Sequence, residues 1–144
     1  MSGSTRPRPV VAMLGNPNTG KTTLFNGLTG LFLRVGNYPG VTVERKSGFV
    51  KVNGTTTVEL LDLPGTYSLA AHSPDEAIVA DVLMGLQPDE SPVDAMVLVL
   101  DAANIRRNLS LLSQLLELEI PAVVALNMVD VARQHGIRVD AQTL

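Results

Sequence analysis

The stretch GNPNTGKT, residues 15–22, constrains this chain more than any other, because it fits the pattern G-x-x-x-x-G-K-[ST] at every fixed position. A polyphosphate needs several backbone N–H groups turned inward, which requires glycines at crowded turns, followed by a helix N-terminus that favours negative charge. Lys21 adds a mobile cation, and Thr22 adds a hydroxyl for magnesium. A strand-like run, residues 9–14, precedes the motif, and a helical pattern closed by Gly30 follows it. The sequence therefore predicts a strand, a phosphate-binding loop and a helix.

The composition is that of one domain outside the membrane. With 144 residues and 45% hydrophobic content, the chain can bury one ordinary core, so we expect one domain at residues 9–144 after a disordered leader at residues 1–8. A net charge of −3, with both signs interspersed, argues against nucleic acid as a direct partner. The absence of cysteine excludes thiolate metal sites. The longest apolar run, residues 95–100, is far below the ~20 residues that span a bilayer, so we expect no direct membrane insertion by this segment.

The part of the chain after the first helix is predicted to hold a loop and a hairpin. Residues 31–46 mix glycines and a proline without a clean period, which is typical of a long surface loop. Such a loop in a compact domain is usually functional, and we expect a mobile switch. Residues 47–52 and 56–61 are β-branched runs separated by Asn53-Gly54, which is a strong hairpin signal. These two runs should pair antiparallel.

The remaining residues alternate between helical and strand patterns. An N-cap serine, a proline and a capping-box glutamate within residues 73–76 begin a helix that Gly85 closes. Residues 95–100 are typical of a parallel strand covered on both faces. A helical pattern then runs from residue 105 up to Pro121, and another buried strand follows at residues 122–126. This order predicts an α/β sheet that is mostly parallel, with one antiparallel edge strand.

A magnesium site is predicted beside the phosphate loop. Asp62 stands at the carboxyl end of a strand, where open α/β sheets bind ligands, and an acid there can hold magnesium through water. An aspartate that merely begins a turn is the alternative, but a magnesium-nucleotide site needs an oxygen ligand at this place. The amide of Gly65 is then placed to meet a terminal phosphate, and its flexibility lets the next loop move when that phosphate leaves. Thr42, in the long loop, adds a hydroxyl that can complete the magnesium shell while the triphosphate is present.

A base-reading pair follows the last predicted strand. Asn127 and Asp130 form the pattern N-x-x-D. A carboxylate can accept two N–H bonds from the guanine edge, and an amide can donate to the ring acceptors, so the pair rejects adenine, whose exocyclic group reverses the pattern. The pattern alone is weak, but its place at the carboxyl end of a strand favours a guanine site.

The phosphate loop, the loop with Thr42, the turn at residues 62–65 and the N-x-x-D motif, taken in this order, resemble a Ras-type GTPase. The particular residues around these motifs resemble the cytosolic G domain of the prokaryotic ferrous iron transport protein B family. The resemblance covers residues 9 to about 140. The segments that carry it are GNPNTGKTTLFNGLTG from Gly15, VGNYPGVTVERKSG from Val35, DLPGTYSL from Asp62, RNLSLLSQLLEL from Arg107 and ALNMVD from Ala125. It implies a P-loop GTPase fold of three layers that binds GTP and GDP and hydrolyses GTP as the cytosolic switch of a ferrous iron transporter.

The resemblance also implies a set of site residues. The nucleotide-binding residues that it implies are Gly15, Asn16, Pro17, Asn18, Thr19, Gly20, Lys21, Thr22, Thr23, Gly40, Val41, Thr42, Asp62, Leu63, Pro64, Gly65, Asn127, Met128 and Asp130. The catalytic residues are Lys21, Thr42 and Gly65, and the magnesium ligands are Thr22, Thr42 and Asp62. Asn18 resembles the residue that helps to hold a potassium ion in potassium-stimulated relatives. Stiffening of the loop is the alternative role for Asn18.

One difference from Ras-type enzymes and two departures from the family pattern bear on these expectations. Thr66 occupies the position where Ras-type enzymes carry a water-orienting glutamine, and its hydroxyl is too short for that task, so slow intrinsic hydrolysis is expected. Tyr38 stands where the family usually has tryptophan. Only fourteen residues follow Asp130, so the last strand, the loop that supports guanine and the final helix are expected to be missing. A helical regulatory domain and a membrane domain are expected after them. The resemblance therefore implies that this segment lies at the cytoplasmic face of the bacterial inner membrane, as part of a larger membrane protein.

Two other functions stay open at this point. The first is a soluble GTPase of tRNA modification or ribosome assembly, which shares the phosphate loop. The second is a module that does not hydrolyse GTP and orders its loop around the nucleotide to dock a partner. Among other charged residues, Arg34 and Arg45 are expected to be solvated rather than arginine fingers, and His72 and His135 lack the spacing of metal ligands.

Overall fold

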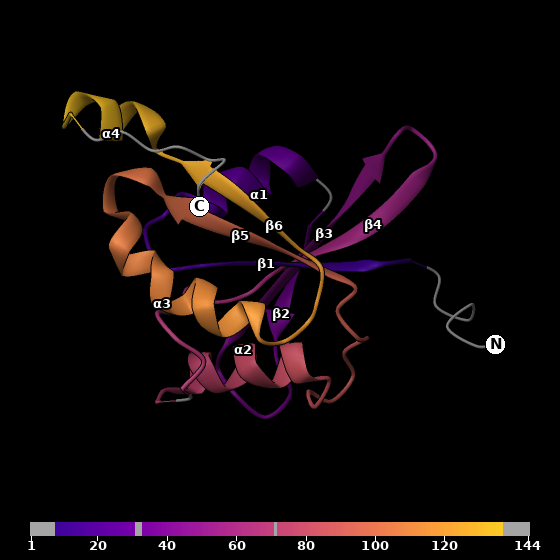
Figure 1. Cartoon of the computed structure of the whole chain (residues 1–144). Coiled ribbons are helices and arrows are strands. Elements are labelled where there is room, and N and C mark those ends of the chain that lie inside the picture. The colour runs from indigo at the N-terminus through magenta and orange to yellow at the C-terminus, as the bar shows by residue number, and fades with distance from the viewer. Residues whose placement is uncertain (1–7, 31–32, 71, 137–144) are drawn as a thin grey trace.

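A computed structural model describes residues 8–30, 33–70 and 72–136 of the chain. A single mixed sheet with helices on both faces makes up this part of the molecule (Figure 1). The predicted leader lies outside the described residues except for Arg8. Along the chain the elements are β1 (Val10–Gly15), α1 (Lys21–Thr29), β2 (Leu33–Asn37), β3 (Glu44–Val52), β4 (Thr56–Asp62), α2 (Pro74–Met84), β5 (Ala95–Asp101), the short 3-10 helix η2 (Ala102–Asn104), α3 (Ile105–Leu116), β6 (Ala122–Asn127) and α4 (Val129–Gln134).

The sheet has the strand order β2-β3-β4-β1-β5-β6. Strand β1 runs parallel to both of its neighbours, β4 and β5, and β5 runs parallel to β6. Strand β3 is antiparallel to β4 and to β2. The turn between β3 and β4 has Asn53 and Gly54 at positive φ, which is the backbone that an Asn-Gly hairpin turn requires. The predicted mixed α/β fold and its hairpin are confirmed.

The prediction of one long loop at residues 31–46 is wrong. The described part of that stretch contains all of β2 and the beginning of β3, which pair from Leu33 opposite Gly48 to Asn37 opposite Glu44. All five residues of β2 are exposed, so this edge strand buries no apolar face and leaves no alternating pattern in the sequence. Strand β2 therefore takes the edge position, β3 lies one place inside it, and the loop shrinks to residues 38–43.

The second helix begins and ends as predicted, whereas the third is shorter. Ser73 caps α2 by accepting a hydrogen bond from the Glu76 amide at 3.2 Å, and Gly85 ends the helix in the left-handed region. Helix α3 ends at Leu116 and does not continue to Pro121. Leu118 lies beyond that end and still packs partly buried against the core, so the apolar pattern outlasts the helix. Helix α4 was not predicted.

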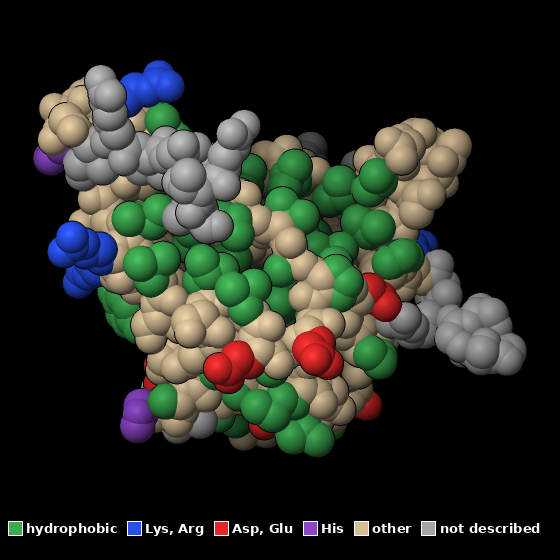
Figure 2. Space-filling view, viewed as in Figure 1, with side chains coloured by type: hydrophobic (Ala, Val, Ile, Leu, Met, Phe, Trp, Pro, Cys, Tyr) green, Lys and Arg blue, Asp and Glu red, His purple; other side chains and the backbone are tan. Residues whose placement is uncertain are grey.

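The core consists of two layers, one on each face of the sheet. Helices α2 and α3 cover one face, and α1 covers the other, where Phe25 packs with Met13, Leu60 and Val99 (Figure 1). Figure 2 shows apolar side chains gathered on the face over α3 and β6. Val123, on β6, is among the exposed apolar residues. None of the helices in the described part of the chain is both long and apolar enough to span a bilayer.

Candidate functional site

The candidate site lies at the edge of the sheet where the parallel strands end. Strands β1, β4, β5 and β6 run in the same direction, so their carboxyl ends bring together Gly15, Asp62, Asp101 and Asn127. The phosphate loop leaves β1 at this edge and enters α1 at Lys21. Parallel sheets bind ligands at this edge because the connecting loops can be shaped there without disturbing the core.

The phosphate loop is held by its own side chains. Asn16 is 3% exposed and Thr19 is equally buried, and the Thr19 hydroxyl donates a hydrogen bond to the Asn16 carbonyl at 3.0 Å. Asn18 and Gly20 both have positive φ, which turns the backbone sharply between β1 and α1. A loop turned in this way can present successive N–H groups to one anion. The structure thus has a sharply turned loop at the place where the sequence predicts a phosphate-binding loop.

Lys21 and Asp62 meet inside this site. The Lys21 ammonium contacts Asp62 Oδ1 and donates a hydrogen bond to the Leu63 carbonyl at 2.7 Å. Both side chains are 9% exposed, so this is a buried ion pair. Each partner neutralises the other, and an incoming phosphate and its metal ion can take over the two roles. A pocket of about 230 Å³ opens beside the pair, lined by Lys21, Val43, Glu44, Lys46, Asp62, Leu63, Pro64, Gly65 and Asp75.

The residues after Asp62 lie directly against the phosphate loop. A Cβ atom added to Gly65 would come within 3.1 Å of Pro17 Cα, so only glycine fits this approach without displacing backbone. The Thr66 amide donates to the Gly15 carbonyl at 3.0 Å. The Thr66 hydroxyl donates to the Ser68 carbonyl at 2.6 Å and lies 3.3 Å from a carboxylate oxygen of Glu76. Thr66 thus uses its hydroxyl to hold its own segment.

The predicted base-reading motif is joined to the phosphate loop. The Asn127 side-chain amide donates a hydrogen bond to the Thr19 carbonyl at 2.9 Å, across 108 residues of sequence. Met128 follows in the left-handed region and begins α4, and Asp130 stands exposed in the first turn of that helix. The N-x-x-D motif therefore lies next to the phosphate loop, and the Asp130 side chain is exposed rather than packed in the core.

Replacement of Gly20 by alanine is expected to destabilise the protein more than the same change at Gly85, which ends α2. Both glycines lie in the left-handed region, but an added Cβ at Gly20 would lie 2.1 Å from Nδ2 of Asn127, whereas at Gly85 no described atom lies within 4 Å. Gly85→Ala should therefore cost only the backbone strain of about 1 kcal/mol, and Gly20→Ala should cost more and displace Asn127. Urea unfolding of both variants measures the difference, and equal losses would contradict it.

The loop at residues 38–43 is anchored at both ends and exposed in between. Tyr38 is 1% exposed, and its amide donates to the Val43 carbonyl at 3.0 Å. Burial raises the pKa of the Tyr38 hydroxyl well above its ordinary value, so this hydroxyl stays neutral. Gly40 has φ 77°, and Thr42 is exposed and does not line the pocket, although Val43 and Glu44 do. The structure brings the loop to the site but leaves Thr42 outside the pocket.

A second polar pocket of about 220 Å³ lies on the α3 side of the phosphate loop. Asn16 spans the gap to α3, because its side-chain amide donates to the Arg107 carbonyl at 2.8 Å. Asn16 Oδ1 is buried with no hydrogen-bond partner among the described residues. Asn18 lines this pocket together with Asp101. Sequence analysis missed Asp101, although it follows a buried strand just as Asp62 does, which is the signal that identifies it.

The residues present suit a magnesium ion. Asp62 supplies a hard oxygen donor, and Glu44 and Asp75 line the same pocket. The described part of the chain holds no group of three carboxylate, histidine or cysteine side chains that could form a metal cage by themselves. Magnesium rarely needs such a cage, because it keeps several waters and binds through one or two protein oxygens and the substrate phosphates.

Neither candidate arginine faces the phosphate loop. Arg34 stacks on the Phe49 ring with its guanidinium carbon 5.2 Å from the ring centre, so it is not simply solvated as expected. Arg45 is also engaged, and its hydrogen bonds to Glu90 raise the pKa of its guanidinium above the ordinary value. Arg34 thus packs against β3, and Arg45 joins β3 to the connection between α2 and β5.

A phosphate loop between a buried strand and a helix, an acid after the neighbouring strand and an N-x-x-D motif bonded to the loop define a P-loop GTPase domain. Comparison with known proteins agrees with this class. A family model described as "Ferrous iron transport protein B" matches residues 9–144. The chain therefore belongs to the ferrous iron transport protein B family.

Among curated relatives, the "Fe(2+) transporter FeoB" of Legionella pneumophila is 48% identical over 136 residues, which is 92% of this chain and 17% of that protein. Among solved structures, an S. thermophilus NFeoB variant bound to GDP has a TM-score of 0.83 and 46% identity over 93% of this chain and 50% of its own. The G domain of the T. maritima FeoB iron transporter has a TM-score of 0.75 and 40% identity, and the match covers 92% of this chain and 85% of that one. The chain thus spans a small part of the curated relative.

Proposed function

We propose that this segment binds GTP with magnesium, hydrolyses it to GDP and phosphate, and acts as the cytosolic switch of a ferrous iron transporter. The observation that carries the proposal is the hydrogen bond from Asn127 to the Thr19 carbonyl, because it joins the base-reading motif to the phosphate cradle. The GDP carried by the S. thermophilus structure supports a guanine nucleotide as the ligand. The family match favours a transporter over a soluble GTPase of tRNA modification or ribosome assembly.

The proposed roles follow from the chemistry of each group. The amides of residues 16–23 hold the phosphates, and Lys21 leaves Asp62 to neutralise charge on the terminal phosphate. Thr22, Asp62 and Thr42 would hold magnesium, which supplies further neutralisation of phosphate charge when bound. Gly65 offers its amide to the terminal phosphate from its place against Pro17. Gly40, Val41, Leu63, Pro64 and Met128 supply backbone contacts, and Asp130 accepts hydrogen bonds from guanine.

Slow hydrolysis and potassium stimulation are proposed for the same site. The Thr66 hydroxyl is engaged with Ser68 and Glu76, so it does not orient the attacking water. Asn18 is exposed on the phosphate loop, where its side-chain oxygen can help to hold a potassium ion near the phosphates. Hydrolysis is expected to be faster in potassium than in sodium buffer, and Asn18→Ala should remove the difference. Equal rates in both buffers for the unchanged chain would contradict this role.

The proposed partners are a helical regulatory domain and a membrane domain that follow this segment, at the cytoplasmic face of the bacterial inner membrane. The curated relatives are consistent with further domains, since this chain spans 17% of their length. A chimera tests the coupling: this segment replaces the matching segment of the L. pneumophila relative in cells without their own ferrous iron uptake. The chimera should restore uptake of labelled ferrous iron, and Lys21→Ala in the chimera should abolish it. Uptake unchanged by Lys21→Ala would contradict a switch role.

A further inference from the structure

The loop that carries Thr42 is held at both ends. Tyr38 and Val43 are 1% and 7% exposed, and both belong to the main apolar cluster between the sheet and helices α2 and α3. The Tyr38 amide donates to the Val43 carbonyl at 3.0 Å, and the Val41 amide donates to the Tyr38 carbonyl at 3.3 Å. The exposed part of the loop is therefore limited to residues 39–42.

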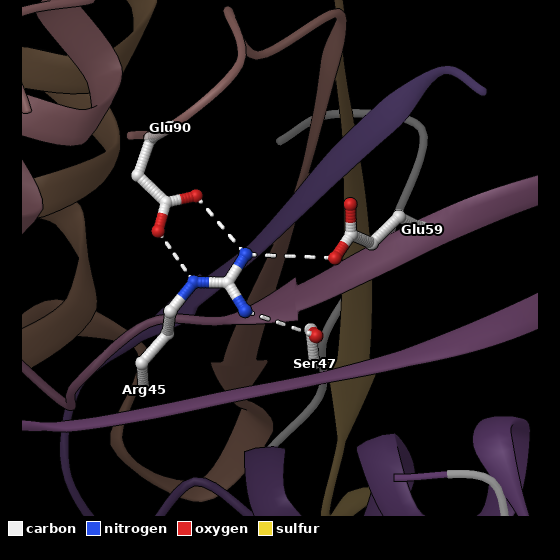
Figure 3. A network of polar contacts seen from close by, with 4 residues as sticks. All are labelled: Arg45, Ser47, Glu59 and Glu90. Atoms are coloured by element: carbon white, nitrogen blue, oxygen red, sulfur yellow. Dashed lines mark hydrogen bonds and ion pairs between the residues drawn. The ribbon is translucent and has the colours of Figure 1, made fainter. Parts of the chain in front are cut away.

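A second attachment lies two residues after Val43. Arg45, on β3, donates from Nε and from Nη2 to the two carboxylate oxygens of Glu90, the latter at 3.1 Å (Figure 3). Its Nη1 donates to the Ser47 hydroxyl at 3.2 Å, and Nη2 lies 3.5 Å from a carboxylate oxygen of Glu59 on β4. The Glu90 side chain is 8% exposed. Arg45 and Glu90 thus form a two-point clamp in which Glu90 is shielded from water and the Arg45 side chain is 25% exposed.

This clamp joins two parts of the chain that share no strand pairing. Glu90 lies in the connection between α2 and β5, whereas Arg45 lies near the start of β3. A guanidinium and a carboxylate joined through two parallel contacts fix both distance and orientation, which a single surface ion pair does not. The clamp therefore adds a second attachment, besides the pairing of β3 with β2, next to Glu44, which lines the pocket beside Lys21 and Asp62.

We propose that Arg45 and Glu90 are positioning residues for Thr42. They hold the start of β3 beside the nucleotide pocket, so that only residues 39–42 must rearrange when Thr42 joins the magnesium shell of bound GTP. This inference rests on the proposed function. A loop whose ends are already in place loses less conformational entropy on ordering, so the clamp favours GTP, which uses Thr42, over GDP, which does not.

The test compares nucleotide affinities of clamp variants with magnesium present. Glu90→Ala and Arg45→Lys are each expected to weaken binding of a non-hydrolysable GTP analogue by about tenfold, with GDP affinity changed less than about twofold. The double variant should be no weaker than either single variant, because both remove the same clamp. Glu59→Gln is the matched control, since it alters a carboxylate that touches the same arginine by one longer contact. An effect of Glu59→Gln equal to that of Glu90→Ala would overturn the assignment to Glu90.

A second readout separates positioning from a general loss of structure. The chain contains no tryptophan, so Tyr38→Trp places a single tryptophan at the buried end of the loop, and excitation at the red edge of the tryptophan band avoids the remaining Tyr67. In that background, Glu90→Ala should leave the emission of the GDP form unchanged and should reduce the change that the GTP analogue causes. Equal weakening of GTP-analogue and GDP binding, or no weakening of either, would overturn the proposal. Thr42→Ala tests the underlying role: if it leaves GTP-analogue affinity intact, the assignment of Thr42 fails whatever the clamp variants do.

Discussion

Replacement of Lys21 by methionine is expected to reduce the rate of GTP hydrolysis by about a thousandfold, because it removes a fixed cation from the developing phosphate charge. The same change should lower the free energy of unfolding of the nucleotide-free protein by about 3 kcal/mol. The second effect follows from the structure, in which Lys21 and Asp62 form a buried pair with both side chains 9% exposed. Without Lys21, the Asp62 carboxylate stays buried with its partner gone.

A double variant separates the two effects of this change. Asp62→Asn combined with Lys21→Met removes both buried charges, so most of the lost stability should return while hydrolysis stays slowed by at least as much as in Lys21→Met. Urea unfolding and single-turnover phosphate release measure the two quantities on the same samples. Full stability of the Lys21→Met variant without nucleotide would show that the pair seen here does not form in solution.

Replacement of Asp130 by asparagine is expected to weaken GTP binding by about a hundredfold or more, because hydrogen bonds to a charged group contribute about 1.5–3 kcal/mol each. A carboxylate accepts from the two N–H groups of the guanine edge, whereas an amide offers one acceptor and places a donor against a donor. Asp130 is exposed in the first turn of α4, so its replacement should leave the free energy of unfolding almost unchanged. Calorimetric titration with GTP measures the loss.

The same variant should gain affinity for xanthosine triphosphate, which carries a carbonyl where guanine carries its amino group and so accepts from the asparagine amide. Glu117→Gln provides a control, since it changes an exposed carboxylate outside the site. Unchanged GTP affinity in Asp130→Asn would contradict the guanine assignment. A loss of affinity for both nucleotides would contradict direct readout by this side chain.

The parts of the fold that the sequence predicted are those with strong local signals. Asn53-Gly54 requires positive φ at both positions and has it, and Ser73 caps α2 through the Glu76 amide. Strand β2 was missed because an exposed edge strand buries neither face and so needs no apolar alternation. The end of α3 was placed too late because Leu118 continues the apolar spacing after the helix has stopped.

The site residues that could be predicted from the sequence are likewise those with strong local signals. The phosphate loop and the N-x-x-D motif were recognisable because their chemistry fixes residue types at fixed spacings. Sequence spacing contains no information on the bond between Asn127 and Thr19, whose residues meet only because β1, β5 and β6 are parallel neighbours. The clamp was missed for a related reason. Glu90 stands in a polar loop without periodicity, 45 residues from Arg45, and only the folded chain brings the two together.

Phosphate release under single-turnover conditions tests the central claim most directly. The protein is mixed in excess over labelled GTP or ATP with magnesium and potassium, and free phosphate is followed over hours, with Lys21→Met as the control. Release from GTP, with none from ATP and none from the control, is the predicted result. No release from GTP would support a binding module that does not hydrolyse its nucleotide, and equal release from ATP would refute the guanine site; either result contradicts the account.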